Sequence, residues 1–389
     1  MNLISLKAPI QEALQERFAA HTTYTSKYAC SNEEIIRKDA SDYDTQTLIR
    51  PAFRRDVEKI INLFAYARYA DKTQVFSFLT HDDISRRSLH VQLVAHVAQN
   101  IGRLLGLNLD LIEAIALGHD LGHTPFGHAG ERFLSKVYHR ETGKYFNHNV
   151  QSVRVLDTLT PRNISLQTLN GILSHNGEFA LKTLKLEPME SFQELHAHMQ
   201  ACNEDESLIA SLRPSTLEGC VVRVSDMIAY IGKDRQDALE MGFIPSLDIF
   251  DSDYLGTSNR EIIHNMTVDI VNESFGKPYI ALSEQAFLDL KRAKRQNYDL
   301  IYSNEGVLDN AHTYIESIFE KLYYQIREDL ETRNQSCAVY KSHLAYLARK
   351  SQNFDLEEYL SQDKNVITCD FIASMTDTYF MRLYKKLFE

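Results

Sequence analysis

The chain has 389 residues, enough to bury the core of one large domain or of about two to three ordinary ones without disulfide or metal support. Its formal net charge of −11 argues against nucleic acid and anionic lipid as general partners, because both attract clustered lysine and arginine. The five cysteines are scattered and have no C-x-x-C spacing, which is typical of a protein from the reducing cytoplasm. No apolar run approaches roughly 18 residues and no signal-peptide pattern is found, so we expect a cytoplasmic protein without a membrane anchor.

Apolar residues recur at helical spacing along most of the chain, beginning with residues 57–65 and 90–105. Asn108 is placed as the N-cap of the next helix, which would carry His119 and Asp120 at its C-terminal end. Neighbours on a helix do not share a face, so one metal ion can recruit both side chains only where the backbone bends. A helix end provides such a bend.

The flanks of this pair also predict a helix boundary. Gly118 and Gly122 fit a helix terminus, and Pro125 suits the first turn of the helix that follows. On that second helix His128 and Glu131 are three residues apart and share one face. We therefore expect the two side chains to interact directly.

Three more helices are predicted over residues 147–156, 166–174 and 216–231. Two polar stretches, residues 185–206 and 245–259, have the composition of exposed connections or insertions. The chain contains no G-x-G-x-x-G motif, no P-loop and no long alternating strands, which argues against Rossmann and P-loop enzymes. The expected fold is all-α.

The predicted elements divide the chain into three parts. Residues 1–50 form an N-terminal segment, and residues 51–240 form a helical core that carries the histidine-rich region. Residues 241–389 form a C-terminal helical region, rich in tyrosine and phenylalanine, with a structural, oligomerisation or regulatory role. Eight basic residues between positions 50 and 87 directly precede the histidine-rich region, where they could neutralise a phosphate.

The candidate metal site combines two imidazoles with two carboxylates, supplied by His90, His119, Asp120 and Asp226. Such a mixed nitrogen and oxygen shell suits a divalent ion, and Mn, Mg, Fe, Co, Ni and Zn all remain open. Incomplete coordination by protein would leave room for water or a substrate oxygen. The isolated histidines, His96, His139 and His175, have the pattern of surface or hydrogen-bonded helix residues and are left out of the site.

At these positions the chain resembles the HD-domain deoxynucleoside triphosphate triphosphohydrolases, also called dGTPase-like proteins. The resemblance rests on blocks in the expected order: R-R-D through K-T-Q-V-F at 54–76, R-S-L-H at 87–90, the long signature at 113–131, and D-M-I-A-Y followed by Asp234 at 226–234. A further block at 370–377, D-F-I-A-S-M-T-D, is similar to the D-Y-I-A-G-M-T-D of bacterial members. The resemblance implies an HD-domain helical core with a helical C-terminal extension.

Carried over position by position, the resemblance assigns three sets of side chains. It makes the metal ligands His90, His119, Asp120 and Asp226. It points to a phosphate and acid/base shell of His123, His128, Glu131 and His148. It places Gln74, Tyr230 and Asp234 at the deoxyribose and Arg87 at the α-phosphate. The chain departs from many members at Val91 and from some at Met227, so we expect its local phosphate contacts to differ from theirs.

The chemistry of these residue types agrees with the resemblance. Phosphate ester hydrolysis needs a nucleophile made from water, which a divalent metal can supply near neutral pH. Arg87, His123 and Lys72 are suitable partners for phosphate charge, and His128 oriented by Glu131 is a suitable general acid. The resemblance implies attack at the α-phosphorus of dGTP or of dNTPs generally, giving a deoxynucleoside and inorganic tripolyphosphate.

Two alternatives remain open at the level of sequence. One is an HD-type phosphohydrolase of another nucleotide, such as a monophosphate, a cyclic nucleotide or a signalling nucleotide. The other is a nucleotide-binding sensor without turnover. The resemblance implies a homo-oligomer and permits an allosteric dNTP, and some relatives interact with single-stranded DNA, which the acidic balance here disfavours.

Overall fold

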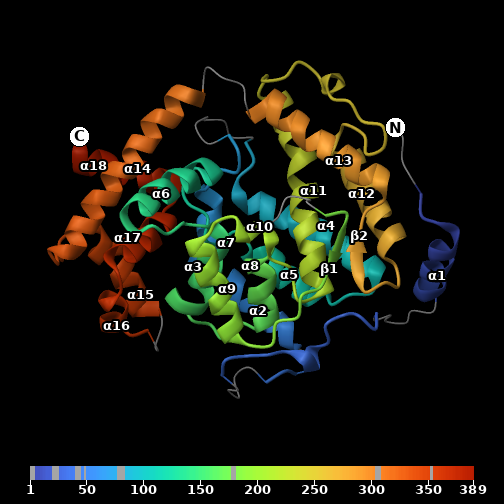
Figure 1. Ribbon diagram of the computed structural model, residues 1–389, viewed down its shortest axis with the longest axis horizontal. Coiled ribbons are helices and arrows are strands. Elements are labelled where there is room, and N and C mark those ends of the chain that lie inside the picture. The colour runs from blue at the N-terminus through green and yellow to red at the C-terminus, as the bar shows by residue number, and fades with distance from the viewer. Residues whose placement is uncertain are drawn as a thin grey trace.

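A computed structural model describes residues 5–19, 26–39, 45–47, 50–76, 84–176, 181–302, 308–350 and 354–389. Over these residues the chain is built almost entirely from helices (Figure 1). Two three-residue strands, β1 (Thr183–Lys185) and β2 (Tyr279–Ala281), pair antiparallel with Thr183 opposite Ala281. The predicted all-α class is confirmed.

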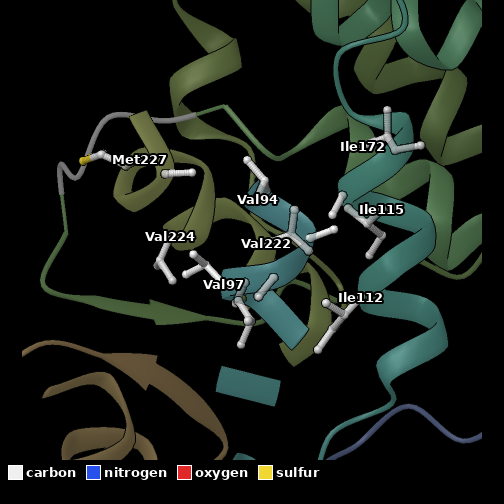
Figure 2. Packing of buried hydrophobic residues seen from close by; sticks show 14 of the residues in the cluster. Val94, Val97, Ile112, Ile115, Ile172, Val222, Val224 and Met227 are labelled. Carbon is white, nitrogen blue, oxygen red and sulfur yellow. The ribbon is translucent and has the colours of Figure 1, made fainter. Parts of the chain in front are cut away.

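The central apolar cluster is formed by α4 (Arg87–Leu105), α5 (Leu109–Gly118), α8 (Leu166–Leu173) and α11 (Leu217–Glu240). Figure 2 shows Val94 and Val97 of α4 among the labelled side chains of α5 and α11, with Ile172 of α8 beside Ile115 of α5. Helices α2 (Ala52–Ile61), α12 (Asn259–Ser274) and α13 (Glu284–Asn297) pack around this centre. Buried apolar surface of this extent is the main stabilising contribution to the helical core.

Local signals set the ends of the helices that carry the site. The Asn108 side chain accepts the backbone N–H of Leu111 at the start of α5, as predicted from the sequence. At the start of α11 the Thr216 hydroxyl accepts from Gly219 in the same way. The C-terminal end of α5 at Gly118 then leaves His119 and Asp120 in the turn that follows.

A second apolar cluster lies beside the first and contains α6 (Gly127–Thr142), α14 (Leu308–Glu331), α17 (Lys364–Ala373) and α18 (Asp377–Phe388). Figure 1 shows these helices together on the left, with the orange and red C-terminal helices against α6. Phe319 is fully buried between Phe126 and Phe380, with ring centroids 6.3 and 4.4 Å away. The aromatic richness of the C-terminal region thus serves, in this part of the chain, to build a core.

The remaining helices among the described residues are shorter or peripheral. They are α1 (Ala8–Ala19), α3 (Phe64–Ala67), α7 (His148–Arg154), α9 (Phe192–Glu204), α10 (Leu208–Ser211), α15 (Ala345–Lys350) and α16 (Leu356–Ser361), with π-helical turns at Val155–Leu159, Tyr298–Tyr302 and Val339–Leu344 and 3₁₀ turns at Asn32–Glu34, Arg68–Asp71 and Leu247–Ile249. No helix in the described part of the chain is long and apolar enough to cross a membrane.

Two sequence expectations differ from the structure. Residues 185–206, expected as an exposed connection, contain the helix α9, whose Leu195 and Cys202 are buried against the first cluster. Pro125 lies before α6 and not in its first turn, because the chain enters the helix through Phe126 with φ 62°. The first cluster also extends past residue 240 through α12 and α13.

Polar side chains connect the two clusters close to the histidine-rich region. Asp370 of α17 accepts hydrogen bonds from Arg154 at 2.7 and 2.8 Å and from Gln151 at 2.9 Å. Asp377 at the start of α18 accepts the N–H and hydroxyl of Thr73 and, at 3.0 Å, the N–H of Phe126. The two aspartates of the 370–377 block therefore hold α7 and the loop before α6 in place.

Candidate metal centre and its acid–base shell

The four residues predicted as metal ligands lie together; we call them the metal group. His90 Nε2 is 2.9 Å from Asp226 Oδ1 and 3.8 Å from Asp120 Oδ2, and His119 Nε2 is 3.4 Å from Asp120 Oδ1 and 3.8 Å from Asp226 Oδ1. They come from α4, the turn after α5, and α11, which are neighbours in the first cluster. The bend after α5 lets the adjacent His119 and Asp120 face the same point, as expected.

The arrangement of His119 fits a metal ligand. Its Nδ1 lies 2.7 Å from the carbonyl oxygen of Ala116, to which it donates, while its fully buried Nε2 has no hydrogen-bond partner. Metal-ligating histidines characteristically donate their second ring nitrogen to such an acceptor, which leaves the ligating nitrogen deprotonated. Burial alone would lower the pKa of His119, but Asp120 and Asp226 raise it to about 9. A proton on Nε2 and a metal ion would therefore compete for the same nitrogen.

Arg87 contacts the metal group directly. Its Nη1 donates to Asp120 Oδ2, and its Nη2 donates to the carbonyl of Thr73 at 3.5 Å. Both Arg87 and Asp120 are buried, at 1% and 3% exposure. Burial by itself would raise the pKa of the Asp120 carboxyl, but Arg87 and the neighbouring histidines hold it well below its usual range. These neighbours favour the ionised form of Asp120.

A second group, which we call the acid–base group, consists of His123, His128, Glu131 and His148. Glu131 Oε2 lies 3.3 Å from His128 Nδ1, and Glu131 Oε1 accepts from His148 Nδ1 at 2.9 Å and from its backbone N–H at 2.7 Å. These two histidines hold the pKa of Glu131 below its usual range against the opposing effect of burial. The predicted pair of His128 and Glu131 is present, and His128 is the exposed member.

His123 joins the two groups. Its ring stacks on His148 with centroids 3.9 Å apart, and its Nε2 is 3.7 Å from Asp120 Oδ1. Burial and the nearby charges of Arg87 and His148 lower the pKa of His123 well below its ordinary value. It is therefore a neutral ring between the metal group and the exposed His128.

The residues expected to face a sugar lie on two elements. Asp226, Tyr230 and Asp234 recur every four residues on α11 and share one face over about 12 Å. Burial raises the pKa of Asp234 to about 7, partly opposed by the hydrogen bond that it accepts from Tyr302 at 2.5 Å. Gln74 is half-buried, and its buried Oε1 has no hydrogen-bond partner.

Two residues behave differently from their sequence interpretation. Lys72, considered as a phosphate partner, is buried and its ammonium donates to the carbonyls of His123 and Ala373. Burial and the neighbouring Arg68 and Arg87 lower the pKa of Lys72 to about 7. His175, left out of the site, is 2% exposed and its ring centroid lies 4.8 Å from that of His119. Its sequence neighbourhood gave no sign of this, because its position depends on the packing of α8 against α5.

Known proteins are similar to this chain over most of its length. The HD domain family matches residues 87–231, which include the metal and acid–base groups. A deoxyguanosinetriphosphate triphosphohydrolase-like protein of Desulfatibacillum aliphaticivorans is 30% identical over 391 residues, covering 97% of this chain and 98% of that protein. A protein of the same name from Geobacter metallireducens is 32% identical over 370 residues, covering 87% and 89% of the two chains. A solved structure of a hypothetical protein from Aquifex aeolicus aligns with a TM-score of 0.36 and 15% identity, covering 86% of this chain and 71% of that one.

Proposed function

The chain belongs to the family of deoxyguanosinetriphosphate triphosphohydrolase-like proteins, and from this we propose that it hydrolyses deoxynucleoside triphosphates to a deoxynucleoside and inorganic tripolyphosphate. One observation carries the proposal. A buried group of two imidazoles and two carboxylates, with an orphaned nitrogen at its centre, lies against a buried arginine on one side and a histidine–carboxylate pair on the other.

In this proposal His90, His119, Asp120 and Asp226 hold a divalent metal ion. When bound, such an ion polarises a phosphoryl oxygen and lowers the pKa of water enough to make a nucleophile near neutral pH. The two-nitrogen, two-oxygen donor set suits Mn, Fe, Co, Ni or Zn, and Mg²⁺ would use mainly the carboxylates. Because Asp226 keeps 24% of its side chain exposed, substrate can approach the group from that side.

Two further tasks, binding the phosphate and protonating the leaving oxygen, are assigned to Arg87 and His128. The Arg87 guanidinium contacts Asp120 and so lies beside the metal group. In this proposal it binds the α-phosphate, because a guanidinium can bind two phosphate oxygens at once. Cleavage between the α-phosphorus and O5′ leaves an alkoxide that needs a proton. In this proposal His128, which is exposed and contacts Glu131, supplies it, and His123 lies beside Asp120.

The sugar would lie against the half-buried face of α11 that carries Asp226 and Tyr230. Gln74 offers an unpartnered buried acceptor for a hydroxyl, and Tyr230 and Asp234 follow Asp226 on the same helical face. His148, whose ring is fixed by Glu131, completes the acid–base shell in this proposal. The roles of these side chains are inferred from their placement and from the family's motifs.

The test is product identification with metal-replete protein, offering each dNTP and NTP separately and in mixtures. The proposal requires tripolyphosphate and a deoxynucleoside; release of phosphate or pyrophosphate would support another HD-type phosphohydrolase instead. Asp120→Ala should lose metal and activity together. His128→Ala should keep metal and triphosphate binding while kcat falls by about 10²–10⁴, and His139→Ala on the same helix, exposed and outside both groups, serves as the matched control. Full activity of Asp120→Ala would rule out the mechanism.

A further inference from the structure

Asp234 and Arg235, which are neighbours on α11, are connected by hydrogen bonds through two other side chains. Arg235 Nε donates to Asn297 Oδ1 at 2.8 Å, and the Tyr302 hydroxyl donates to Asp234 Oδ2 at 2.5 Å. Asn297 is the last residue of α13, and Tyr302 is the last residue of the π-helical turn that follows. A hydrogen bond between Asn297 and Tyr302 closes the ring, and it opposes the large rise in the pKa of Tyr302 that burial and Asp234 cause. We call these four residues the polar ring.

The direction of each hydrogen bond in the polar ring follows from Arg235. A guanidinium can only donate, so Asn297 must present its oxygen to Arg235. The amide nitrogen of Asn297 then faces the carbonyl of Ile231, 2.9 Å away, and Tyr302. Because that nitrogen can only donate, the Tyr302 oxygen accepts from Asn297 and its single hydrogen goes to Asp234. Arg235 thereby sets, through two side chains, the direction in which the Tyr302 hydroxyl donates.

Packing alone does not explain an arginine at position 235. Arg235 is fully buried, and in the described part of the chain its hydrogen bonds go to neutral acceptors, including the carbonyls of Ala293 at 3.3 Å and Thr257 at 3.4 Å. Burial lowers its pKa to about 10, so the guanidinium is still charged near neutral pH. A buried charge without a carboxylate partner is costly, and an apolar side chain of similar volume would fill the space at lower cost. The guanidinium therefore serves through its hydrogen bonds.

A third apolar cluster joins the polar ring to the segment that carries Gln74. The Arg235 guanidinium lies 4.0 Å from the ring centre of Phe250. Phe250 belongs to this cluster, whose buried members are Phe76, Ile84, Ala238, Ile244, Phe250 and Ile301. Phe76 follows Gln74 by two residues, and Ile301 lies in the π-helical turn that ends in the polar ring. The polar ring and Gln74, both expected near the sugar, therefore pack on the same cluster.

We propose that Arg235 is a positioning residue, which acts through the polar ring to orient the Asp234 carboxylate toward the sugar hydroxyl of a deoxynucleoside triphosphate. The inference rests on the proposed function for the placement of the sugar beside Asp234. A 2′-deoxyribose in a triphosphate has one free hydroxyl, at C3′, and a carboxylate can accept a hydrogen bond from it. Tyr302 donates to Asp234 Oδ2, so Oδ1 is the oxygen assigned to this hydroxyl.

The test compares dGTP with 2′,3′-dideoxy-GTP, which lacks that hydroxyl. Dissociation constants are measured by isothermal titration calorimetry on the full, metal-replete chain in the His128→Ala background, which is expected to bind triphosphate with little turnover. We expect Arg235→Met to weaken the binding of dGTP by about three- to tenfold, because one hydrogen bond is lost, and to leave the binding of 2′,3′-dideoxy-GTP unchanged. Arg295→Met, which replaces an exposed arginine of α13, is the matched control and should change neither.

Two further variants separate positioning from packing. Asn297→Asp keeps an acceptor for Arg235 but removes the N–H that faces Tyr302, so it should weaken the binding of dGTP as Arg235→Met does. Tyr302→Phe removes the donor to Asp234 and should have the same effect. Adding Arg235→Met to Tyr302→Phe should bring little further loss, because both changes release the same carboxylate.

Three results would overturn the proposal. Equal weakening of both nucleotides by Arg235→Met, or unchanged dGTP binding by a folded Asn297→Asp, would assign Arg235 to packing. Additive losses in the double variant would show that Arg235 and Tyr302 act separately. Equal affinity of the His128→Ala background for the two nucleotides would remove the hydroxyl contact itself. The proposed function fails separately, if the wild type releases no tripolyphosphate from any dNTP; the same titrations, made without His128→Ala, then still decide the role of Arg235.

Discussion

Glu218 is a buried carboxyl whose ionisation should control stability. It is fully buried in the first turn of α11, where Oε1 accepts the backbone N–H groups of Cys30 at 3.0 Å and Asn108 at 2.9 Å, while Oε2 has no partner. Burial raises its pKa from 4.5 to about 7, although the backbone hydrogen bonds oppose the shift. The residue links the N-terminal segment to the cap of α5, the helix that leads to the metal group.

The sign of the effect follows from these two values. The folded protein keeps the Glu218 proton over a pH range in which the unfolded chain has lost it, so the stabilisation is fully present below pH 4.5 and is lost as the pH rises to about 7. One pKa unit corresponds to about 1.4 kcal/mol, so the protonation of Glu218 contributes about 3 kcal/mol to the free energy of unfolding. About 2.5 kcal/mol of this contribution is lost between pH 5 and pH 8.

Glu218→Gln keeps the acceptor for Cys30 and Asn108 but cannot ionise. The free energy of unfolding of both proteins is measured by urea titration in the presence of chelator. The value for the variant minus the value for the wild type should be larger at pH 8 than at pH 5 by about 2.5 kcal/mol. Glu240→Gln, at the exposed end of the same helix, is the control and should show no such change. An equal difference between Glu218→Gln and the wild type at the two pH values would refute the reasoning.

Three further changes probe the packing that positions the site. Phe319→Ala, in the centre of the second cluster, should lower the free energy of unfolding by about 3–5 kcal/mol in denaturant titration, because a fully buried ring leaves a cavity. Gly122→Ala should lower both stability and turnover, since its Cβ would collide with backbone atoms of α7 and displace it; in Gly143→Ala the new Cβ meets no atom, so turnover should be kept despite the strain of its positive φ. Asp377→Asn should lower the free energy of unfolding by about 1–3 kcal/mol and should lower kcat/KM. Three buried groups donate to Asp377, and in the variant one of them would face an amide N–H instead of an oxygen. Unchanged melting and kinetics would exclude this bridge as a support of the site.

Helical periodicity and local caps were sufficient to predict the helices that carry the site. Asn108, the glycine-flanked pair His119-Asp120 and the spacing of His128 and Glu131 are local signals, and the structure places each as expected. These signals act within one turn of a helix, so a single sequence contains them. His90 and Asp226 were joined to the pair as ligands of suitable type, and the family resemblance gave them the same role; periodicity alone could not do this.

Features that depend on packing between distant segments were not predictable. His175 lies in the site because α8 packs against α5, and nothing within a few residues of it indicates this contact. Lys72 and Arg54 belong to the basic segment expected near phosphate, yet Lys72 donates to backbone carbonyls and Arg54 pairs with Glu113 at 2.6 Å. Charge in a sequence shows that partners are needed, but the fold decides which they are.

The metal group and the pair of His128 and Glu131 are carried by helices of different apolar clusters. His90, His119 and Asp226 depend on the first cluster, whereas α6 packs into the second and the two are joined by bridges such as Asp370 with Arg154. The distance between acid and metal is therefore set by how two separately packed bodies dock. On heating, turnover should be lost at a lower temperature than the helical circular dichroism signal. It should return on cooling, because the two clusters can dock again without any refolding.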